Sequence, residues 1–527
     1  MLKPGFFFAL GTILSRVVGL VRESVIAATF GAGFHLDAFL VANRIPNLMR
    51  ELVAEGAFGS SFTKIFAQIY NQSQEKATQF YQFTFSCALA SGLLLSAIGI
   101  YMAPQLVHLI VKNESAGAEF IKSCTFLVRV LFPFITIMML VALSQGALYG
   151  RNKFFLSAAS PIALSLGYIL GATWLGDIFE QLLSPSFDFE YADRRLFSLA
   201  IGVLLGGMGS LLLQTASINR VLNLQHLQVW KCFSKFRSEI KQLCLLMGPM
   251  VLASSAGQIN VMVNTYFATS LEHGAVSWLN LSFRLVQLPV GVFAVGAAAV
   301  LLPQLSVTYQ SSDKSKTQHL LYRTSRTMIW TLIPCACFLY LSATEVIMLI
   351  YKYGVFSLTD VRYTAECLQA YAIGLLGYGL VKVWTVPYYA HNHTQGAMVI
   401  SIVGIAINYA LNSILVTRYG AWGLALTSST LLFWQALMLG GGLCLLKVPM
   451  SWNRLIKDIF LTFTCAAFAF ALHTWIKSLS YWKPIEQTHR ILLAIQVCIL
   501  GLSVMIPFIL AAQVFLNFKI FEFKRKI

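Results

Sequence analysis

Residues 10–66 read LGTILSRVVGLVRESVIAATFGAGFHLDAFLVANRIPNLMRELVAEGAFGSSFTKIF. Both halves of this stretch are apolar, and each is long enough to cross a bilayer. They nevertheless carry ionisable side chains, namely Arg16, Arg22, Glu23, Asp37, Arg44, Arg50, Glu51 and Glu55. Such groups are costly at membrane depth, so they normally face one another or a water-filled cavity. We therefore expect two cavity-lining helices here, which the rest of the chain supports and moves.

The composition predicts a polytopic membrane protein. Of 527 residues, 57% are hydrophobic and only 11% are charged, whereas a soluble domain carries about 25% charged residues. The alternating pattern of an outer-membrane barrel is absent, so the spans are expected to be helices. Lys3 precedes a span with two arginines rather than a short signal-peptide core, which argues against a cleavable signal.

Apolar runs divide the chain into about fourteen expected spans. They lie near 5–31, 36–66, 79–111, 122–149, 155–177, 195–220, 241–270, 274–306, 320–342, 365–389, 395–416, 420–445, 455–476 and 491–516. The net charge of +17 is concentrated in every second connection and in the tail. This pattern predicts that both termini are cytoplasmic. Basic residues inside spans suggest an anionic ligand as well.

The two halves of the chain resemble each other at an offset of 240 residues. Arg44 falls on Arg284, Ala54 on Ala294, Gly56 on Gly296 and Ala57 on Ala297. Residues 221–240 alternate apolar and basic side chains, as an interfacial linker does. We expect an N-lobe over 1–220, the linker and a C-lobe over 221–446, and two additional helices with a basic tail over 447–527. Two six-helix lobes would face each other across one cavity.

Arginines within the spans are the candidate cargo ligands. Arg16 and Arg22 flank Gly19, where a bend could bring both to one side, and Arg284 lies about ten residues into its own span. Arginine suits a phosphate because its planar fork makes two parallel bonds and stays charged when desolvated. The alternative is that these side chains snorkel to the membrane interface.

A second polar set lies along one helical stripe. Asp37, Arg44, Glu51 and Glu55 are spaced by 7, 7 and 4 residues, which leaves them within roughly 60° of one face. Pro46 and Asn47 are expected to kink the helix. We predict a hydrated cavity wall with Asp37 toward the periplasm, and Glu51, Glu55 and Arg44 forming gate pairs near the cytoplasm. The alternative is a set of interior ion pairs that locks helices together.

Sites for metals or catalysis are weakly indicated. Asn264, Asn408 and Asn412, with Thr427 or Ser428, could coordinate a small cation, but without a carboxylate interhelical hydrogen bonding is favoured. Ten cysteines are scattered, and the Cys335–Cys337 pair has no partner set for a metal. No metalloprotease, phosphate-loop or Ser/His/Asp signature occurs, so no catalytic residue is expected.

Several motifs together resemble the MurJ (MviN) lipid II flippases. They are Ser15-Arg16-x-x-Gly19-x-x-Arg22, Phe30-Gly31-Ala32-Gly33, Asp37-Ala38-Phe39 and Pro46-Asn47-Leu48-x-Arg50-x4-Glu55-Gly56-Ala57-Phe58. Later pieces agree, namely Gln258-Ile259-Asn260, Ser277-Trp278, Arg284 with Pro289-x-Gly291, and Leu302-Pro303. The resemblance runs end to end and is most specific in the first sixty residues.

The resemblance implies an all-α fold like that of MATE transporters, in the MOP exporter superfamily. Two six-helix lobes would form a V, and two further helices would frame a groove for a lipid tail. It implies alternating-access export of lipid II, the undecaprenyl-pyrophosphate-linked peptidoglycan precursor, across the bacterial inner membrane.

The resemblance also assigns residues. The family's essential cavity arginines fall on Arg16, Arg22, Arg50 and Arg284, and its acidic positions on Asp37 and Glu55. A sodium site of some members falls on Asn264, Asn408, Asn412 and Thr427 or Ser428, but those members have aspartate where this chain has Asn264 and Asn412. We therefore expect no cofactor, with membrane potential as the driving force. Expected partners are lipid II, membrane lipids and the cell-wall synthesis machinery, not nucleic acid, for a monomeric protein.

Two other functions are weighed against this one. A related exporter could carry another polyprenyl-pyrophosphate glycan, or cationic drugs, although drugs would favour a cavity of carboxylates and aromatics. A membrane glycosyltransferase would need a catalytic base or metal ligands in a large extracytoplasmic loop, and the longest such loop here has only about twenty residues.

Overall fold

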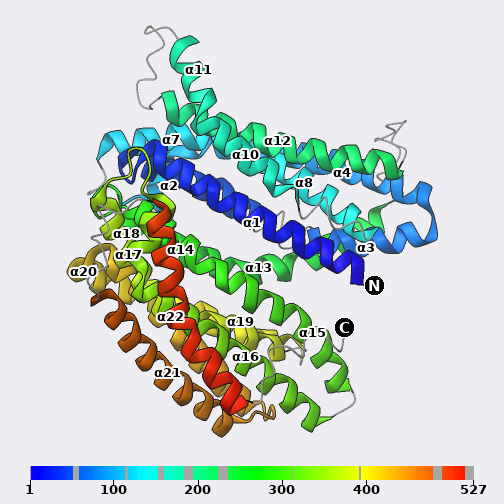
Figure 1. The fold of residues 1–527 in the computed structure, drawn as a ribbon. Coiled ribbons are helices and arrows are strands. Elements are labelled where there is room, and N and C mark those ends of the chain that lie inside the picture. The colour runs from blue at the N-terminus through cyan, green and yellow to red at the C-terminus, as the bar shows by residue number, and fades with distance from the viewer. Residues whose placement is uncertain are drawn as a thin grey trace. The chain divides into compact units, whose positions relative to one another are not determined.

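The computed structural model describes residues 2–51, 59–112, 117–151, 159–182, 194–222, 236–310, 313–390, 393–478 and 490–516. Within these ranges the regular structure is helical and contains no β-strand (Figure 1). The all-α class predicted from the sequence is therefore confirmed. The chain divides into two compact units: unit 1 is Met1–Ser277 with Tyr353–Phe356, and unit 2 is Trp278–Lys352 with Ser357–Ile527.

Unit 1 is built from helices that pack around α2. They are α1 (Leu2–Phe30), α2 (Phe34–Met49), α3 (Gly59–Gln72), α4 (Gln74–Tyr101), α5 (Ala103–Ile110), α7 (Ala118–Leu131), α8 (Pro133–Gly150), α10 (Pro161–Ala172), α11 (Trp174–Leu182), α12 (Arg194–Leu222) and α13 (Arg237–Ala268). The α2 helix contacts α1, α5, α7, α8, α12 and α13. Its side chains at Leu36, Phe39, Val41 and Ile45 are buried, so α2 forms much of the core of this unit.

Unit 2 begins at Trp278, within α14. Its elements are α14 (Ala275–Pro289), the π-helix η3 (Val290–Val295), α15 (Gly296–Gln310), α16 (Lys314–Leu341), α17 (Ala343–Tyr351), α18 (Leu358–Ile373), α19 (Leu375–Ala390), α20 (Thr394–Leu445), α21 (Trp452–Ser478) and α22 (Arg490–Leu516). Helix α16 contacts α15, α18, α19, α21 and α22, and so holds the last two helices to the rest of the unit.

The boundaries of the compact units differ from the predicted lobe boundaries at 220 and 446. Helix α13 groups with unit 1, although the repeat places it in the second lobe. Compact units follow packing in one conformation, whereas lobes follow the repeat, so the lobe boundaries stay a prediction. The amphipathic linker falls largely on 223–235 and the basic tail on 517–527, both outside the described residues.

The described helices account for part of the fourteen membrane spans that the sequence predicts. In the described part of the chain, eight helices are long and apolar enough to cross a membrane, or up to ten if two bent pairs count as single spans. Helix α20 covers two predicted spans and is interrupted at Gly420, whose φ of 55° is favourable only for glycine. The protein is thus polytopic, and the number fourteen stays a prediction.

Helix α2 is not broken where the sequence predicts a kink. It runs through Pro46 to Met49, and the wider π-type turn comes at residues 50–51. Neighbouring helices can satisfy the carbonyl that a proline leaves free, so proline is tolerated in membrane helices. In the second half, η3 begins at Val290, which is position 50 shifted by the repeat offset of 240. The corresponding helices of the two halves therefore both change to a π-type turn at equivalent positions.

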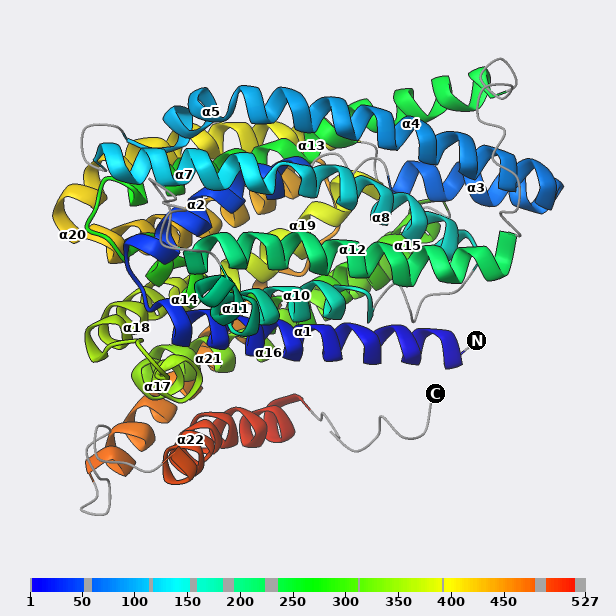
Figure 2. The same cartoon turned by 90° about the horizontal axis from the view of Figure 1, so that it is seen from above.

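Helices α10 and α12 approach closely through facing glycines (Figure 2). Gly167 and Gly171 lie one turn apart on α10, opposite Gly202 and Gly206 on α12. A Cβ atom added to Gly202 would lie 2.4 Å from the Gly167 carbonyl oxygen and 2.6 Å from the Gly171 Cα atom. Small residues at such spacing let helix backbones pack closely in a membrane. This interface therefore depends on glycine having no side chain at these four positions.

Gly202→Ala is expected to lower stability by about 1–3 kcal/mol, because the added methyl group overpacks a backbone contact. The measurement is the thermal unfolding midpoint of the purified protein. Gly209→Ala on the same helix is the matched control, since a Cβ there would lie 3.7 Å from its nearest neighbour. Equal midpoints for the two variants would contradict the close-packing argument.

Candidate functional site

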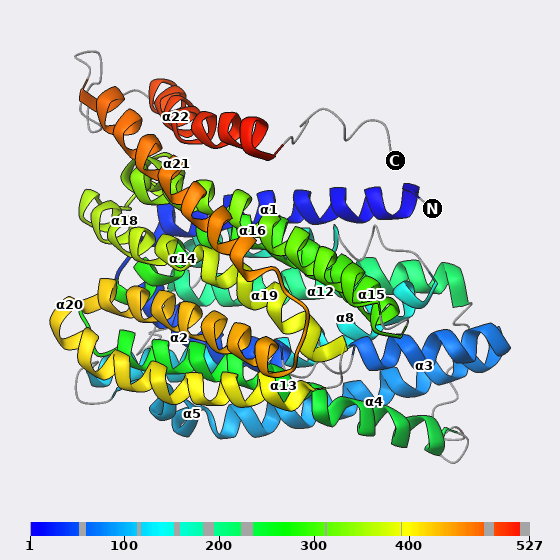
Figure 3. The same cartoon turned by 90° about the horizontal axis from the view of Figure 1, so that it is seen from below.

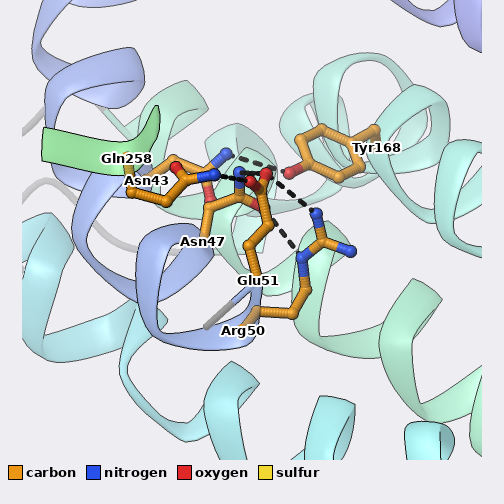
Figure 4. Close-up of polar contacts among 6 residues, drawn as sticks. All are labelled: Asn43, Asn47, Arg50, Glu51, Tyr168 and Gln258. Carbon is orange, nitrogen blue, oxygen red and sulfur yellow. Dashed lines mark hydrogen bonds and ion pairs between the residues drawn. The ribbon is translucent and has the colours of Figure 1, made fainter. Parts of the chain in front are cut away.

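The end of α2 carries a polar cluster that joins it to α13 (Figure 4). Arg50 Nε donates to Asn47 Oδ1 at 2.8 Å, and Asn47 Nδ2 donates to Glu51 Oε1 at 3.1 Å. The Arg50 Nη2 and Glu51 Oε1 atoms form an ion pair at 3.5 Å. Gln258 on α13 donates from Nε2 to Glu51 Oε2. Glu51 therefore holds Arg50 with one oxygen and the neighbouring helix with the other.

A second group of contacts connects α1, α2 and α10 through Tyr168. The Asn43 Nδ2 atom donates to the Tyr168 hydroxyl at 3.1 Å (Figure 4). The Arg22 guanidinium lies 4.7 Å from the centre of the same ring, within range of a cation–π interaction. Arg22 Nη2 also pairs with Glu23 Oε1 at 2.5 Å. Tyr168 and Glu23 thus hold the Arg22 fork in one place.

Both arginines are paired but still partly open to solvent. The side chains of Arg22 and Arg50 are 15% and 16% exposed, while those of Glu23 and Glu51 are 8% and 34% exposed. Desolvated charges are tolerable only when paired, so each carboxylate offsets the cost of its arginine. An incoming phosphate would compete with these carboxylates for bidentate arginine bonds. The arrangement suits reversible anion binding rather than bond-making chemistry.

Asp37 is buried and makes a structural contact in this structure, and its place in a cavity wall stays a prediction. It is only 3% exposed. Its carboxylate accepts hydrogen bonds from the Gly274 N–H at 2.6 Å, the Ser277 N–H at 2.8 Å and the Ser277 hydroxyl at 2.5 Å. These donors lie in the first turn of α14 and in the residue just before it, where unpaired N–H groups and the helix dipole favour a negative charge. Asp37 therefore caps α14.

The other predicted site residues fall in different parts of the molecule. Arg16 lies on α1 and Arg44 on α2, both partly buried within unit 1. Arg284 lies on α14 in unit 2 and is also partly buried. Glu51 pairs with Arg50 next to it, and Glu55 lies outside the described residues. The structure thus brings together Arg50 and Glu51, with Asn43, Asn47, Tyr168 and Gln258, in one unit.

The predicted sodium ligands engage one another and their own helices. Asn264 is on α13 in unit 1, whereas Asn408, Asn412 and Thr427 are fully buried on α20 in unit 2. Asn412 Nδ2 donates to Asn408 Oδ1 at 3.4 Å, and the hydroxyl of Thr427 donates to the Gly423 carbonyl at 3.0 Å. Ser428 likewise donates to Leu424. These contacts fit a hydrogen-bonding role for the set.

Tyr168 is the contact that sequence reasoning missed. It stands in an apolar span, where an aromatic residue usually belongs to the core. Its hydroxyl group was the available signal, because buried tyrosines normally find a hydrogen-bond partner. The sequence predicts Asn47 as part of a kink and of a family motif, and the structure adds that its side chain orients Arg50.

Comparison with known proteins gives consistent matches. The family model for "Lipid II flippase MurJ" matches residues 26–493. A lipid II flippase MurJ of Burkholderia cenocepacia is 31% identical over 417 residues, which cover 79% of this chain and 78% of that protein.

Solved structures match the fold. A lipid II flippase MurJ in an inward closed conformation aligns with a TM-score of 0.76 at 22% identity, covering 97% of this chain and 99% of that one. An inward-facing multidrug resistance MATE transporter of the MOP superfamily aligns with a TM-score of 0.64 at 14% identity, covering 82% and 95%. The helices of this chain therefore follow the fold that these transporters share.

Proposed function

Because the chain belongs to the family of lipid II flippases MurJ, we propose that it carries lipid II from the cytoplasmic to the periplasmic leaflet of the bacterial inner membrane. The family match over residues 26–493 carries this proposal, and the paired arginines of unit 1 support it. The protein is a transporter and not an enzyme, since moving a lipid between leaflets breaks no covalent bond. Export of drugs or of another lipid-linked glycan is not favoured.

The arginine pairs suggest how the cargo is held. In this proposal, the pyrophosphate displaces Glu23 from Arg22 and Glu51 from Arg50, so that one charge-assisted contact replaces another. Arg16 and Arg284 are proposed as further ligands of the pyrophosphate. Glu51 also accepts from Gln258 on α13, so cargo at Arg50 would change a contact between two helices. That coupling gives Glu51 a gating role in alternating access.

The test of this function is complementation. Cells depleted of their own lipid II flippase are expected to grow when they express this chain, because it would restore the supply of precursor to the periplasm. A chain with Arg50→Ala, expressed to the same level, is expected to fail. Continued lysis with the parent chain present in the membrane would refute the proposal.

The proposed topology places both termini and the 221–240 linker in the cytoplasm. Basic residues cluster in these parts of the sequence, and such clusters stay on the cytoplasmic side. A reporter fused after Ile527 that is active only in the cytoplasm is expected to give signal, and a periplasm-only reporter is expected to be silent. The opposite pair of results would overturn the topology.

Sodium is expected to be dispensable for export. Hard cations are usually held by at least one carboxylate, whereas the candidate ligands Asn264, Asn408 and Asn412 are neutral. Export is measured with sodium replaced by potassium or choline at constant membrane potential, which we propose as the driving force. Loss of export when sodium is replaced would contradict this expectation. We further propose a monomer that works with membrane lipids and the cell-wall synthesis machinery.

A further inference from the structure

Unit 2 contains a buried ionic cluster where α21 meets the bend between α16 and α17. Figure 3 shows α21 running alongside α16. The two segments α16 and α17 meet at 78°. Lys477, in the last turn of α21, pairs with Glu345 Oε1 at 2.5 Å and donates to the Leu341 carbonyl at 3.3 Å. Glu345 is 1% exposed. One lysine therefore ties the end of α21 to both sides of the bend.

His473 lies one turn before Lys477, on the same face of α21. It is 2% exposed, and although the Leu341 carbonyl lies close to the ring, its ring nitrogens make no hydrogen bond of good geometry among the described residues. The same holds for Glu345 Oε2 and the Ser342 hydroxyl, which is also buried at the bend. Buried polar atoms are nearly always paired. Three side chains at one corner with polar atoms that lack a well-formed hydrogen bond therefore indicate a site with a second arrangement of contacts.

The charges around His473 are few and opposed. Lys477 on α21 and Glu345 on α17 act on it, and α16 contributes the Leu341 carbonyl. In the described parts of the neighbouring helices, Arg490 on α22 donates to the Lys352 carbonyl, and Arg362 on α18 pairs with Glu366. With neutral His473, the cluster holds one positive and one negative charge.

We propose that Glu345, His473 and Lys477 form a proton-binding site at the α16–α17 bend. A proton taken up from water turns both ring nitrogens of His473 into donors, and one of them donates to Glu345 Oε2. The corner then holds two positive charges and one negative charge, which is unfavourable away from water. Lys477 has a side chain 33% exposed, so its ammonium group moves into water and releases Leu341 and the bend.

The proton state of His473 thereby sets whether the end of α21 is locked to the bend. Exchange of one partner for another between packed helices is a two-state switch rather than a gradual shift. Under the proposed topology this end of α21 faces the periplasm, so the site would respond to periplasmic pH. A histidine titrates near pH 6.5 when unperturbed, closer to physiological pH than the carboxylate or the amine.

Hydrogen–deuterium exchange of the full chain in lipid nanodiscs tests the site without any cargo. Exchange over residues 338–350 is compared at about pH 5 and about pH 7.5, the acid value lying well below the pH of about 6.5 at which a free histidine titrates, after correction for the intrinsic effect of pH. We expect acid to raise exchange about fivefold or more in the parent. His473→Gln is expected to keep the slow rate at both pH values.

Two further variants complete the design. Lys477→Gln is expected to exchange at neutral pH as fast as the parent does in acid, because the tie to Leu341 is gone. His319→Gln, an exposed histidine on α16, is the matched control and should behave like the parent. An acid response in His473→Gln equal to that of the parent would overturn the proposal, as would slow neutral exchange in Lys477→Gln. Failure of lipid II export would leave these results unaffected.

Discussion

Alanine at Arg16, Arg22 or Arg284 is expected to weaken lipid II binding roughly tenfold to more than a hundredfold, since a lost charge-assisted bond costs about 1.5–3 kcal/mol. Arg22 should show the effect most clearly. Its fork is already oriented by Glu23 and by the Tyr168 ring, so little ordering cost is left when a phosphate binds. Lysine should restore binding only in part, because it keeps the charge and loses the fork.

Membrane abundance must be measured beside lipid II binding for these variants. Arg22→Ala leaves Glu23, whose side chain is 8% exposed, without this partner, and an uncompensated buried charge can unfold a protein. Arg22→Lys retains a positive charge for Glu23 and so separates binding from folding. Arg362→Ala is the control, since Arg362 is 77% exposed and pairs with Glu366 at 3.0 Å. Abundant alanine variants that bind lipid II like the parent would end the phosphate-ligand hypothesis.

Asp37→Asn is expected to destabilise the protein by about 1.5–3 kcal/mol, the usual worth of a hydrogen bond to a charged group. The carboxylate accepts from two N–H groups and a hydroxyl at the start of α14. An asparagine keeps one acceptor oxygen, but its NH2 group is itself a donor and would face one of the donors at the start of α14. It also removes the negative charge that the N-terminus of a helix favours. We therefore expect a lower unfolding midpoint together with reduced export.

Ser277→Ala is the matched comparison for Asp37. It removes only the hydroxyl donor and should cost about 1 kcal/mol. The three unfolding midpoints should therefore decrease in the order parent, Ser277→Ala, Asp37→Asn. An Asp37→Asn protein that is as stable as the parent, yet inactive, would instead support the cavity-lining role that the sequence predicts for Asp37.

The sequence was sufficient for the helical class and for the polytopic membrane protein, and it shows which apolar runs carry arginines, whose role as ligands stays a prediction. Those features are local, because a charged residue within an apolar run is visible without knowing what packs against it. The break in α20 is local in the same way. The two predicted spans 395–416 and 420–445 meet next to Gly420, where the helix is interrupted.

The role of Asp37 could not be predicted because its partner Ser277 lies 240 residues further along the chain. Glu51 and Gln258 are likewise far apart, separated by 207 positions in the sequence, and Tyr168 reaches Asn43 from α10. Helical periodicity placed Asp37, Arg44 and Glu51 on one face, but it carries no information about which helix end that face meets. The position of the π-type turn after Pro46 also depends on neighbouring helices.

Transfer of lipid II between the leaflets of a defined liposome tests the central claim most directly. Purified protein is reconstituted with lipid II, a membrane potential is imposed, and the fraction of lipid II accessible from outside is followed with time. We expect the parent protein to move lipid II, Arg362→Ala to match it, and Arg22→Lys to move it more slowly at equal protein content. A parent protein that leaves the distribution of lipid II unchanged, or an Arg22→Lys protein as fast as the parent, would contradict the account.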